Sequence, residues 1–131
     1  MDDSSVDPAT VAHKNQPLWV RLGFAFKGLQ FALHSENSLR FQASVFVAVL
    51  VALAILRPGP LWWAIVLLAS SAVLAAELFN TALERLVDHL HPDVHPHIRI
   101  VKDCAAAAVL LTALGAVAVG IAFAVHLLSK G

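Results

Sequence analysis

Charged side chains are scarce in this chain of 131 residues: they make up 14% of it, against 59% apolar residues. Soluble globular proteins typically contain about 25% charged residues, because polar groups must cover much of their surface. The formal net charge is zero, so nothing indicates a nucleic-acid partner, since nucleic-acid-binding domains usually carry a basic patch. We therefore expect a protein whose main solvent is lipid.

The chain also has little cysteine and lacks the common nucleotide-binding loops. Cys104 is the one cysteine, which excludes an intrachain disulfide, and we interpret it as a packed small residue. The chain has neither a GxxxxGK[ST] loop nor a glycine-rich kinase loop, which disfavours the known soluble nucleotide-binding folds. Residues 1–17 are too polar for a signal peptide, and we expect a mobile tail there.

Four largely apolar segments follow the tail and predict a single all-α membrane domain over residues 18–131. The first, about 18–34, carries two basic residues and a glutamine, which suits an amphipathic surface helix at the membrane interface or a helix packed on the rest of the protein. The other three are long enough to cross a bilayer core at about 1.5 Å per residue. We expect these spans at about 39–56, at 61–80 with a continuation to 90, and at about 104–128.

Basic residues are distributed unevenly around these spans. Two lie on one side, Arg57 and Lys130. The other seven share the opposite side: Lys14, Arg21, Lys27, Arg40, Arg85, Arg99 and Lys102. Because cytoplasmic loops of membrane proteins are enriched in Lys and Arg, we expect the N-terminus and the long second connection in the cytoplasm.

A stripe of polar residues runs along the second span. At about 100° per residue, its five members fall within about 100° of the helix circumference: Glu77, Asn80, Thr81, Glu84 and Asp88. A solvated face explains Asp88 but explains Glu77 poorly, because Glu77 directly follows sixteen uncharged residues. Carboxylates at membrane depth are costly, so we interpret the stripe as a functional site.

The residue types in this stripe suit phosphoryl transfer, which needs positioning, charge neutralisation and an oriented nucleophile. Mg²⁺ binds one or two carboxylates together with phosphate oxygens. A carboxylate at the membrane boundary can also act as general base for a lipid hydroxyl. Lys102 offers a point charge for phosphate, although a membrane-flanking cation explains it equally well.

Residues 77–88, ELFNTALERLVD, resemble the E-x-x-N-[ST]-A-x-E-x-x-x-D signature of the prokaryotic diacylglycerol kinase family, which includes the undecaprenol kinases. The resemblance extends to Phe26-Lys27-Gly28-Leu29, to Glu36 and to Lys102-Asp103, in the family's order, from about Phe24 to the C-terminus. It implies an ATP- and Mg²⁺-dependent lipid kinase in the bacterial cytoplasmic (inner) membrane, assembled as a homotrimer.

The resemblance also implies roles for individual residues. Glu77 resembles the catalytic base, and Glu36 and Glu84 resemble Mg²⁺ ligands that also contact ATP. Further ATP-binding residues are implied at Asp93, Val94, His95, Lys102 and Asp103. Lipid contacts are implied at Asn37, Ser38, Leu39, Arg40 and Phe41, together with Glu77 and Asn80.

Two departures from the family pattern concern the lipid. The proteobacterial branch often reads E-x-x-F-R-Q-E, whereas this chain has Gln42 in place of the second acid. Alanine follows Lys102-Asp103-Cys104, where that branch can carry serine. Both differences resemble the undecaprenol branch. Diacylglycerol, the family's namesake substrate, is our first expectation, and undecaprenol is the alternative.

A histidine cluster leaves a different class of function open, that of a small non-enzymatic metal-binding or transport subunit. Its members are His89, His91, His95 and His97. Pro92 and Pro96 make their spacing irregular and no cysteine is nearby, so we favour a solvated loop over a zinc site.

Overall fold

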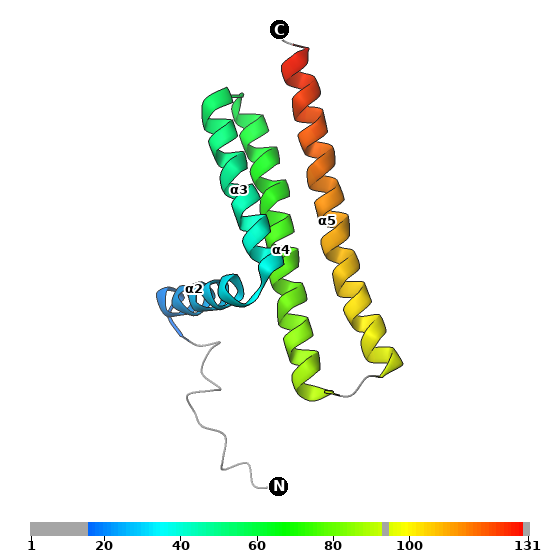
Figure 1. The fold of residues 1–131 in the computed structure, drawn as a ribbon. Coiled ribbons are helices and arrows are strands. Elements are labelled where there is room, and N and C mark those ends of the chain that lie inside the picture. The colour runs from blue at the N-terminus through cyan, green and yellow to red at the C-terminus, as the bar shows by residue number, and fades with distance from the viewer. Residues whose placement is uncertain (1–15, 93–94, 130–131) are drawn as a thin grey trace, which may run out of the picture.

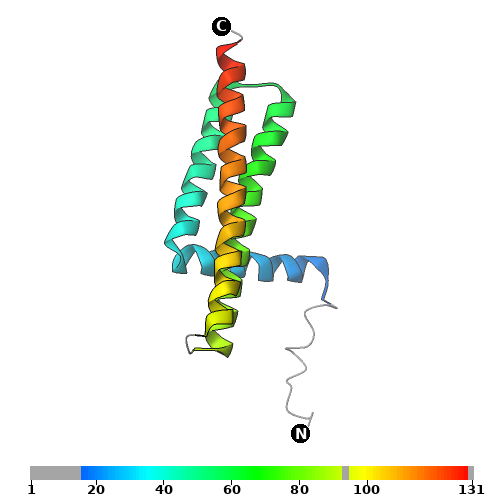
Figure 2. The ribbon, with the colours of Figure 1, turned by 90° about the vertical axis from the view of Figure 1, so that its right-hand side faces the viewer.

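The computed structural model describes residues 16–92 and 95–129. These residues form four helices and no strand: α2 (Leu18–Ser35), α3 (Asn37–Leu56), α4 (Pro60–Leu90) and α5 (Pro96–Leu128). In both Figure 1 and Figure 2, α3, α4 and α5 run side by side, and α2 lies across this bundle. The all-α prediction is confirmed. The predicted mobile tail falls almost wholly outside the described residues.

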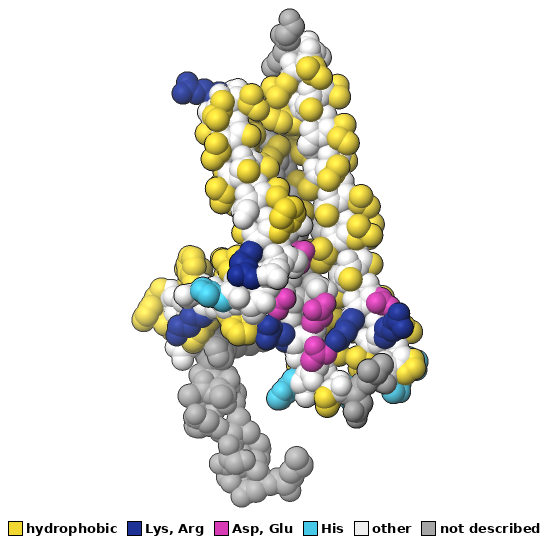
Figure 3. Space-filling view, in the orientation of Figure 1, with side chains coloured by type: hydrophobic (Ala, Val, Ile, Leu, Met, Phe, Trp, Pro, Cys, Tyr) yellow, Lys and Arg dark blue, Asp and Glu magenta, His cyan; other side chains and the backbone are white. Residues whose placement is uncertain are grey.

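Three of the helices, α3, α4 and α5, are long and apolar enough to cross a membrane, which confirms the three predicted spans. The 20 residues of α3 give roughly 30 Å, about the thickness of a bilayer core, whereas 31 residues in α4 and 33 in α5 give roughly 46 and 50 Å. The surplus length of α4 and α5 extends past α2 at one end of the bundle (Figure 1). Most of the charged side chains gather at and beside that end (Figure 3).

A single residue, Glu36, separates α2 from α3 and turns the chain. Its backbone is extended, with φ −117° and ψ 119°. Its N–H donates to the carbonyl of Ala32 at 2.9 Å, and its own carbonyl accepts from the N–H of Arg40 at 3.2 Å. Because Glu36 both ends α2 and begins α3, its side chain projects from this elbow in the chain.

The turn at the other end of α3 depends on Arg57 and the prolines after it. Arg57 has a left-handed backbone (φ 45°) and donates its N–H to the carbonyl of Leu53 at 2.9 Å, which closes α3. Pro60 then occupies the first position of α4, where its missing N–H costs no hydrogen bond. Arg57 therefore lies at the end of the bundle opposite Glu36.

Helix α5 begins earlier than its apolar run alone predicted. It starts at Pro96, and the ring Nδ1 of the preceding His95 accepts the N–H of His97 at 3.3 Å. Proline favours the first helical position because its φ is already helical. Lys102 and Asp103 consequently lie within α5, not in the connection before it.

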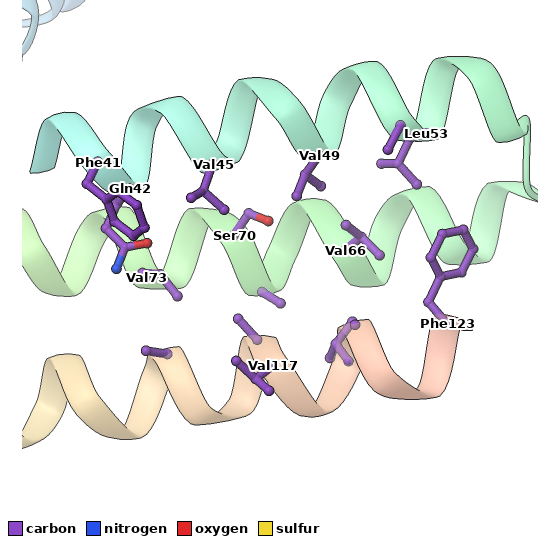
Figure 4. Close-up of a pocket in the computed structure, with 16 residues that line it drawn as sticks. Phe41, Gln42, Val45, Val49, Leu53, Val66, Ser70, Val73, Val117 and Phe123 are labelled. Atoms are coloured by element: carbon purple, nitrogen blue, oxygen red, sulfur yellow. The ribbon is translucent and has the colours of Figure 1, made fainter. Parts of the chain in front are cut away.

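Helix α4 is central, since it contacts each of the other three helices. The core is small, and its buried apolar side chains are Ala32, Leu39, Leu53, Val66 and Val73. A hollow of about 410 Å³ lies between α3, α4 and α5, with side chains such as Val45, Val66 and Val117 around it (Figure 4). No ionisable side chain lines this hollow, so the chemistry has to be sought elsewhere.

Candidate active site

The polar stripe of α4 runs from a buried end to an exposed end. Glu77 and Thr81 are buried, with 5% and 6% of their surface exposed. Asn80 and Glu84 are half-buried, and Asp88, one turn further on, is exposed. The stripe therefore carries carboxylates from the protein interior out to the polar end of the bundle along one helix.

Glu77 is the buried carboxylate of this stripe. The hydroxyl of Ser38, in the first turn of α3, donates to Glu77 Oε2 at 3.0 Å. Within the described residues Glu77 forms no ion pair. A buried carboxylate held by one neutral donor, without a cation beside it, keeps a free oxygen with which to accept a proton.

Asn80 lies one turn along the stripe from Glu77 and has an unused acceptor. Its Nδ2 donates to Glu84 Oε1 at 3.0 Å. Its Oδ1 is buried and has no hydrogen-bond partner among the described residues. A buried acceptor without a partner costs about 1–3 kcal/mol, so this atom is well placed to accept a hydrogen bond from a ligand.

The exposed end of the stripe borders a hollow of about 310 Å³, which we call the acidic hollow. Four side chains line it: Glu36, Glu84, Arg85 and Asp88. Arg85 donates to Glu36 Oε1 at 2.9 Å, and Lys102 of α5 forms an ion pair with Asp88. The elbow thus brings the Glu36 carboxylate next to Arg85 of α4. Lys102 reaches the acidic hollow from α5.

The acidic hollow suits Mg²⁺ better than a metal held by protein alone. In the part of the chain that the structure describes, no three His, Cys, Asp or Glu side chains are grouped closely enough to hold a metal. Glu36 and Glu84 supply two carboxylates, and Mg²⁺ characteristically takes one or two together with phosphate oxygens. These donors therefore fit a metal that arrives with a nucleotide.

The other predicted nucleotide-binding residues are only partly brought together. Asp93 and Val94 lie outside the described residues. His95 is exposed at the start of α5, where its ring stacks on that of His97 at a centroid distance of 5.4 Å. Asp103 is also exposed and faces Arg99, with 4.0 Å between Asp103 Oδ2 and Arg99 Nε. Of the members of this group that the structure describes, Lys102 alone pairs with a side chain of the acidic hollow.

The predicted lipid-contacting segment at the start of α3 has varied surroundings. Ser38 contacts Glu77, whereas Leu39 is fully buried and packs in the core. Arg40 donates to Asn37 of the same helix, and Phe41 is 67% exposed. Phe41 also lines the apolar hollow between the three spans (Figure 4).

The sequence of this chain fits a known family. The model of the family described as prokaryotic diacylglycerol kinase matches residues 23–124, which contain the elbow, the whole polar stripe and Lys102. The chain belongs to the prokaryotic diacylglycerol kinase family. The resemblance found in its motifs is confirmed.

Two relatives of this chain within the family are named for different lipid substrates. A diacylglycerol kinase of Synechocystis sp. is 38% identical over 104 residues, which cover 79% of this chain and 59% of that protein. An undecaprenol kinase of Bacillus subtilis is 30% identical over 97 residues, which cover 74% of this chain and 79% of that protein. The matched region is thus less than two thirds of the Synechocystis protein.

The histidine cluster stays apart from the acidic hollow of this kinase-family chain. All four histidines are exposed, and His91 and His95 border a separate hollow of about 380 Å³ with Leu90, Pro92 and Ile98. Among the described residues they are not part of any group that could hold a metal. The geometry therefore gives no support to a metal-binding subunit.

Arg85 is a site residue to which sequence reasoning gave no chemical role. The sequence alone places it among the basic residues expected on the cytoplasmic side. A signal existed: Arg85 follows Thr81 by four residues, so it lies on the edge of the polar stripe. What the sequence could not show is that the Glu36 elbow lies opposite this edge.

Proposed function

We propose that this chain is a lipid kinase that transfers the γ-phosphate of ATP to the hydroxyl of a membrane lipid. The observation that carries the proposal is that α4 presents two different environments a short distance apart. A buried carboxylate, Glu77, lies next to the apolar part of the helix, and the acidic hollow lies at its polar end. A lipid hydroxyl and a water-soluble nucleotide can meet between them.

In this proposal Glu77 is the general base. Its carboxylate takes the proton of the lipid hydroxyl, whose oxygen attacks the γ-phosphorus while the bond to the β-phosphate oxygen breaks and ADP leaves. Ser38 orients Glu77 through the 3.0 Å hydrogen bond, and the unpaired Asn80 Oδ1 is available to accept from the lipid headgroup. With 5% of its surface exposed, Glu77 has limited access to water that would compete with the lipid as nucleophile.

The acidic hollow would hold the nucleotide. We propose that Glu36 and Glu84 bind Mg²⁺ and that Lys102 binds phosphate. Bound Mg²⁺ would neutralise charge on the phosphate oxygens. Lys102 is already held at the hollow by Asp88, so it needs only a change of partner to reach an anion there.

The lipid is proposed to be diacylglycerol, which would give phosphatidic acid. The 38% identity to the Synechocystis diacylglycerol kinase supports it. Undecaprenol is the second candidate, supported by the 30% identity to the Bacillus enzyme over most of that enzyme's length.

We also propose a homotrimer in the bacterial cytoplasmic membrane, with the N-terminus in the cytoplasm. The grouping of basic side chains at one end of the bundle supports this orientation (Figure 3). No residue of α5 is buried within the described chain, although α5 is rich in the small residues at which membrane helices pack closely. Further copies of the chain would cover this surface.

The test is a direct phosphorylation assay. Purified protein in detergent receives Mg-ATP labelled on the γ-phosphate and either diacylglycerol or undecaprenol, with a lipid-free sample as control. We expect labelled lipid in both reactions and a faster rate with diacylglycerol. A faster rate with undecaprenol would reverse the substrate assignment, and no labelled lipid in either reaction would overturn the kinase proposal.

A further inference from the structure

Arg85 joins three parts of the molecule at the acidic hollow. Its guanidinium donates to Glu36 Oε1 at 2.9 Å, and its Cζ lies 4.8 Å from the centre of the Phe31 ring on α2. Its side chain is half exposed, so it can move without unpacking the core. The proposed function leaves this arginine without a role.

The charges of the acidic hollow are already largely balanced inside the protein. Glu36 is paired with Arg85, and Asp88 is paired with Lys102. Among the described residues, Glu84 receives only the neutral donor Asn80 Nδ2, at 3.0 Å. A divalent cation bound by Glu36 and Glu84 would thus have to compete with the guanidinium for the Glu36 carboxylate.

We propose that Arg85 is a placeholder cation, which neutralises Glu36 in the empty site and moves to the nucleotide phosphates when the metal binds. The inference rests on the proposed kinase function and adds a nucleotide-binding residue to it. Arginine suits this exchange because its planar fork binds carboxylate and phosphate with the same two-pronged geometry. Phe31 would keep the guanidinium beside the hollow while it changes partner.

The placeholder role predicts opposite effects on two ligands. Without Arg85, Glu36 loses its competing cation, so a divalent metal alone should bind more tightly. The nucleotide loses a positive charge, so it should bind more weakly. A residue that merely holds Glu36 in position would weaken both, and a residue that only links α2 to α4 would change neither.

The experiment compares Arg85→Gln with the unmodified protein in detergent. Mn²⁺ binding without nucleotide is followed by electron paramagnetic resonance, and binding of a non-hydrolysable ATP analogue with Mg²⁺ by calorimetry. We expect the Kd for Mn²⁺ to fall by about tenfold and the Kd for the analogue to rise by about tenfold, or about 1.4 kcal/mol each. Parallel weakening of both ligands, or no change in either, would overturn the proposal.

Two further variants separate charge from shape. Arg85→Lys keeps the charge but loses the fork, so Mn²⁺ binding should stay within about twofold while analogue binding weakens. Arg21→Gln removes an exposed arginine of α2 outside the acidic hollow and should change neither Kd. Lipid phosphorylation by the unmodified protein is measured alongside: its absence would overturn the kinase function, whereas an active protein with an unresponsive Arg85 would overturn the placeholder alone.

Discussion

Glu77 and the carboxylates of the acidic hollow lie on or beside the same helix, but their environments differ sharply. Glu77 is 5% exposed and receives one hydrogen bond from a neutral hydroxyl. Glu36 is half-buried and Asp88 is exposed, and each pairs with a basic side chain. Two turns of α4 separate Glu77 from Glu84, the nearest carboxylate of the hollow along the chain.

The difference shows how one helix can supply two kinds of chemistry from the same functional group. When environments differ this much, carboxylates take different roles: a shielded one suits proton transfer, and an open, charged group suits cations and nucleotides. The difference arises because α4 packs against α3 at Glu77, where Ser38 contacts the carboxylate, whereas its end around Asp88 is exposed. The variants below test whether the two ends are functionally distinct.

Glu77→Gln should have the largest effect. The substitution keeps the shape and can keep the contact with Ser38, but an amide cannot take the proton of a lipid hydroxyl. Removal of a general base typically lowers the rate by about 10²–10⁴-fold. We expect the lipid phosphorylation rate to fall in that range, while the helical content by circular dichroism and the Kd for the ATP analogue stay close to those of the unmodified protein.

The nucleotide Kd is the informative control for this variant. If Glu77 lay within the nucleotide site, analogue binding would weaken along with the rate. A Glu77→Gln protein that keeps near-normal turnover would remove Glu77 as the base.

Glu84→Gln should act on the metal instead of the proton. It removes one of the two carboxylates proposed for Mg²⁺ but leaves the Ser38–Glu77 contact in place. We expect the Mg²⁺ concentration for half-maximal rate to rise by about tenfold, equivalent to about 1.4 kcal/mol. The measurement is the phosphorylation rate across a Mg²⁺ titration, and an unchanged titration curve would contradict the ligand role.

The sequence was sufficient to predict those features that depend on local patterns. The lengths of the apolar runs predicted three spans, and the 3.6-residue period placed five polar residues on one face of α4. The contacts that assemble the site could not be predicted from these patterns, because they join segments that are distant in the sequence. Glu36 and Arg85 are 49 residues apart, and Ser38 and Glu77 are 39 apart. The first contact depends on the elbow from which Glu36 projects, and the second on the turn at Arg57 that packs α3 against α4.

The early start of α5 escaped prediction for a different physical reason. Residues 96–103 mix charged and apolar side chains, so they do not look like part of a span. They nevertheless continue α5 as one helix, with Pro96 suited to its first turn. Hydropathy detects the lipid-facing part of such a helix and not its continuation into water.

Ser38→Ala should have the smallest effect of the three and tests how Glu77 is held. The change removes the 3.0 Å hydrogen bond but leaves the carboxylate itself. Because Ser38 is exposed at the start of α3, water can replace part of this hydrogen bond. We therefore expect the free energy of unfolding to fall by about 1 kcal/mol and the phosphorylation rate to fall by about fivefold to tenfold. Ser44→Ala is the matched control, since the Ser44 hydroxyl donates at 2.9 Å to the Arg40 carbonyl of its own helix and does not touch Glu77. Equal effects of the two substitutions on the phosphorylation rate would mean that Ser38 does not orient the base.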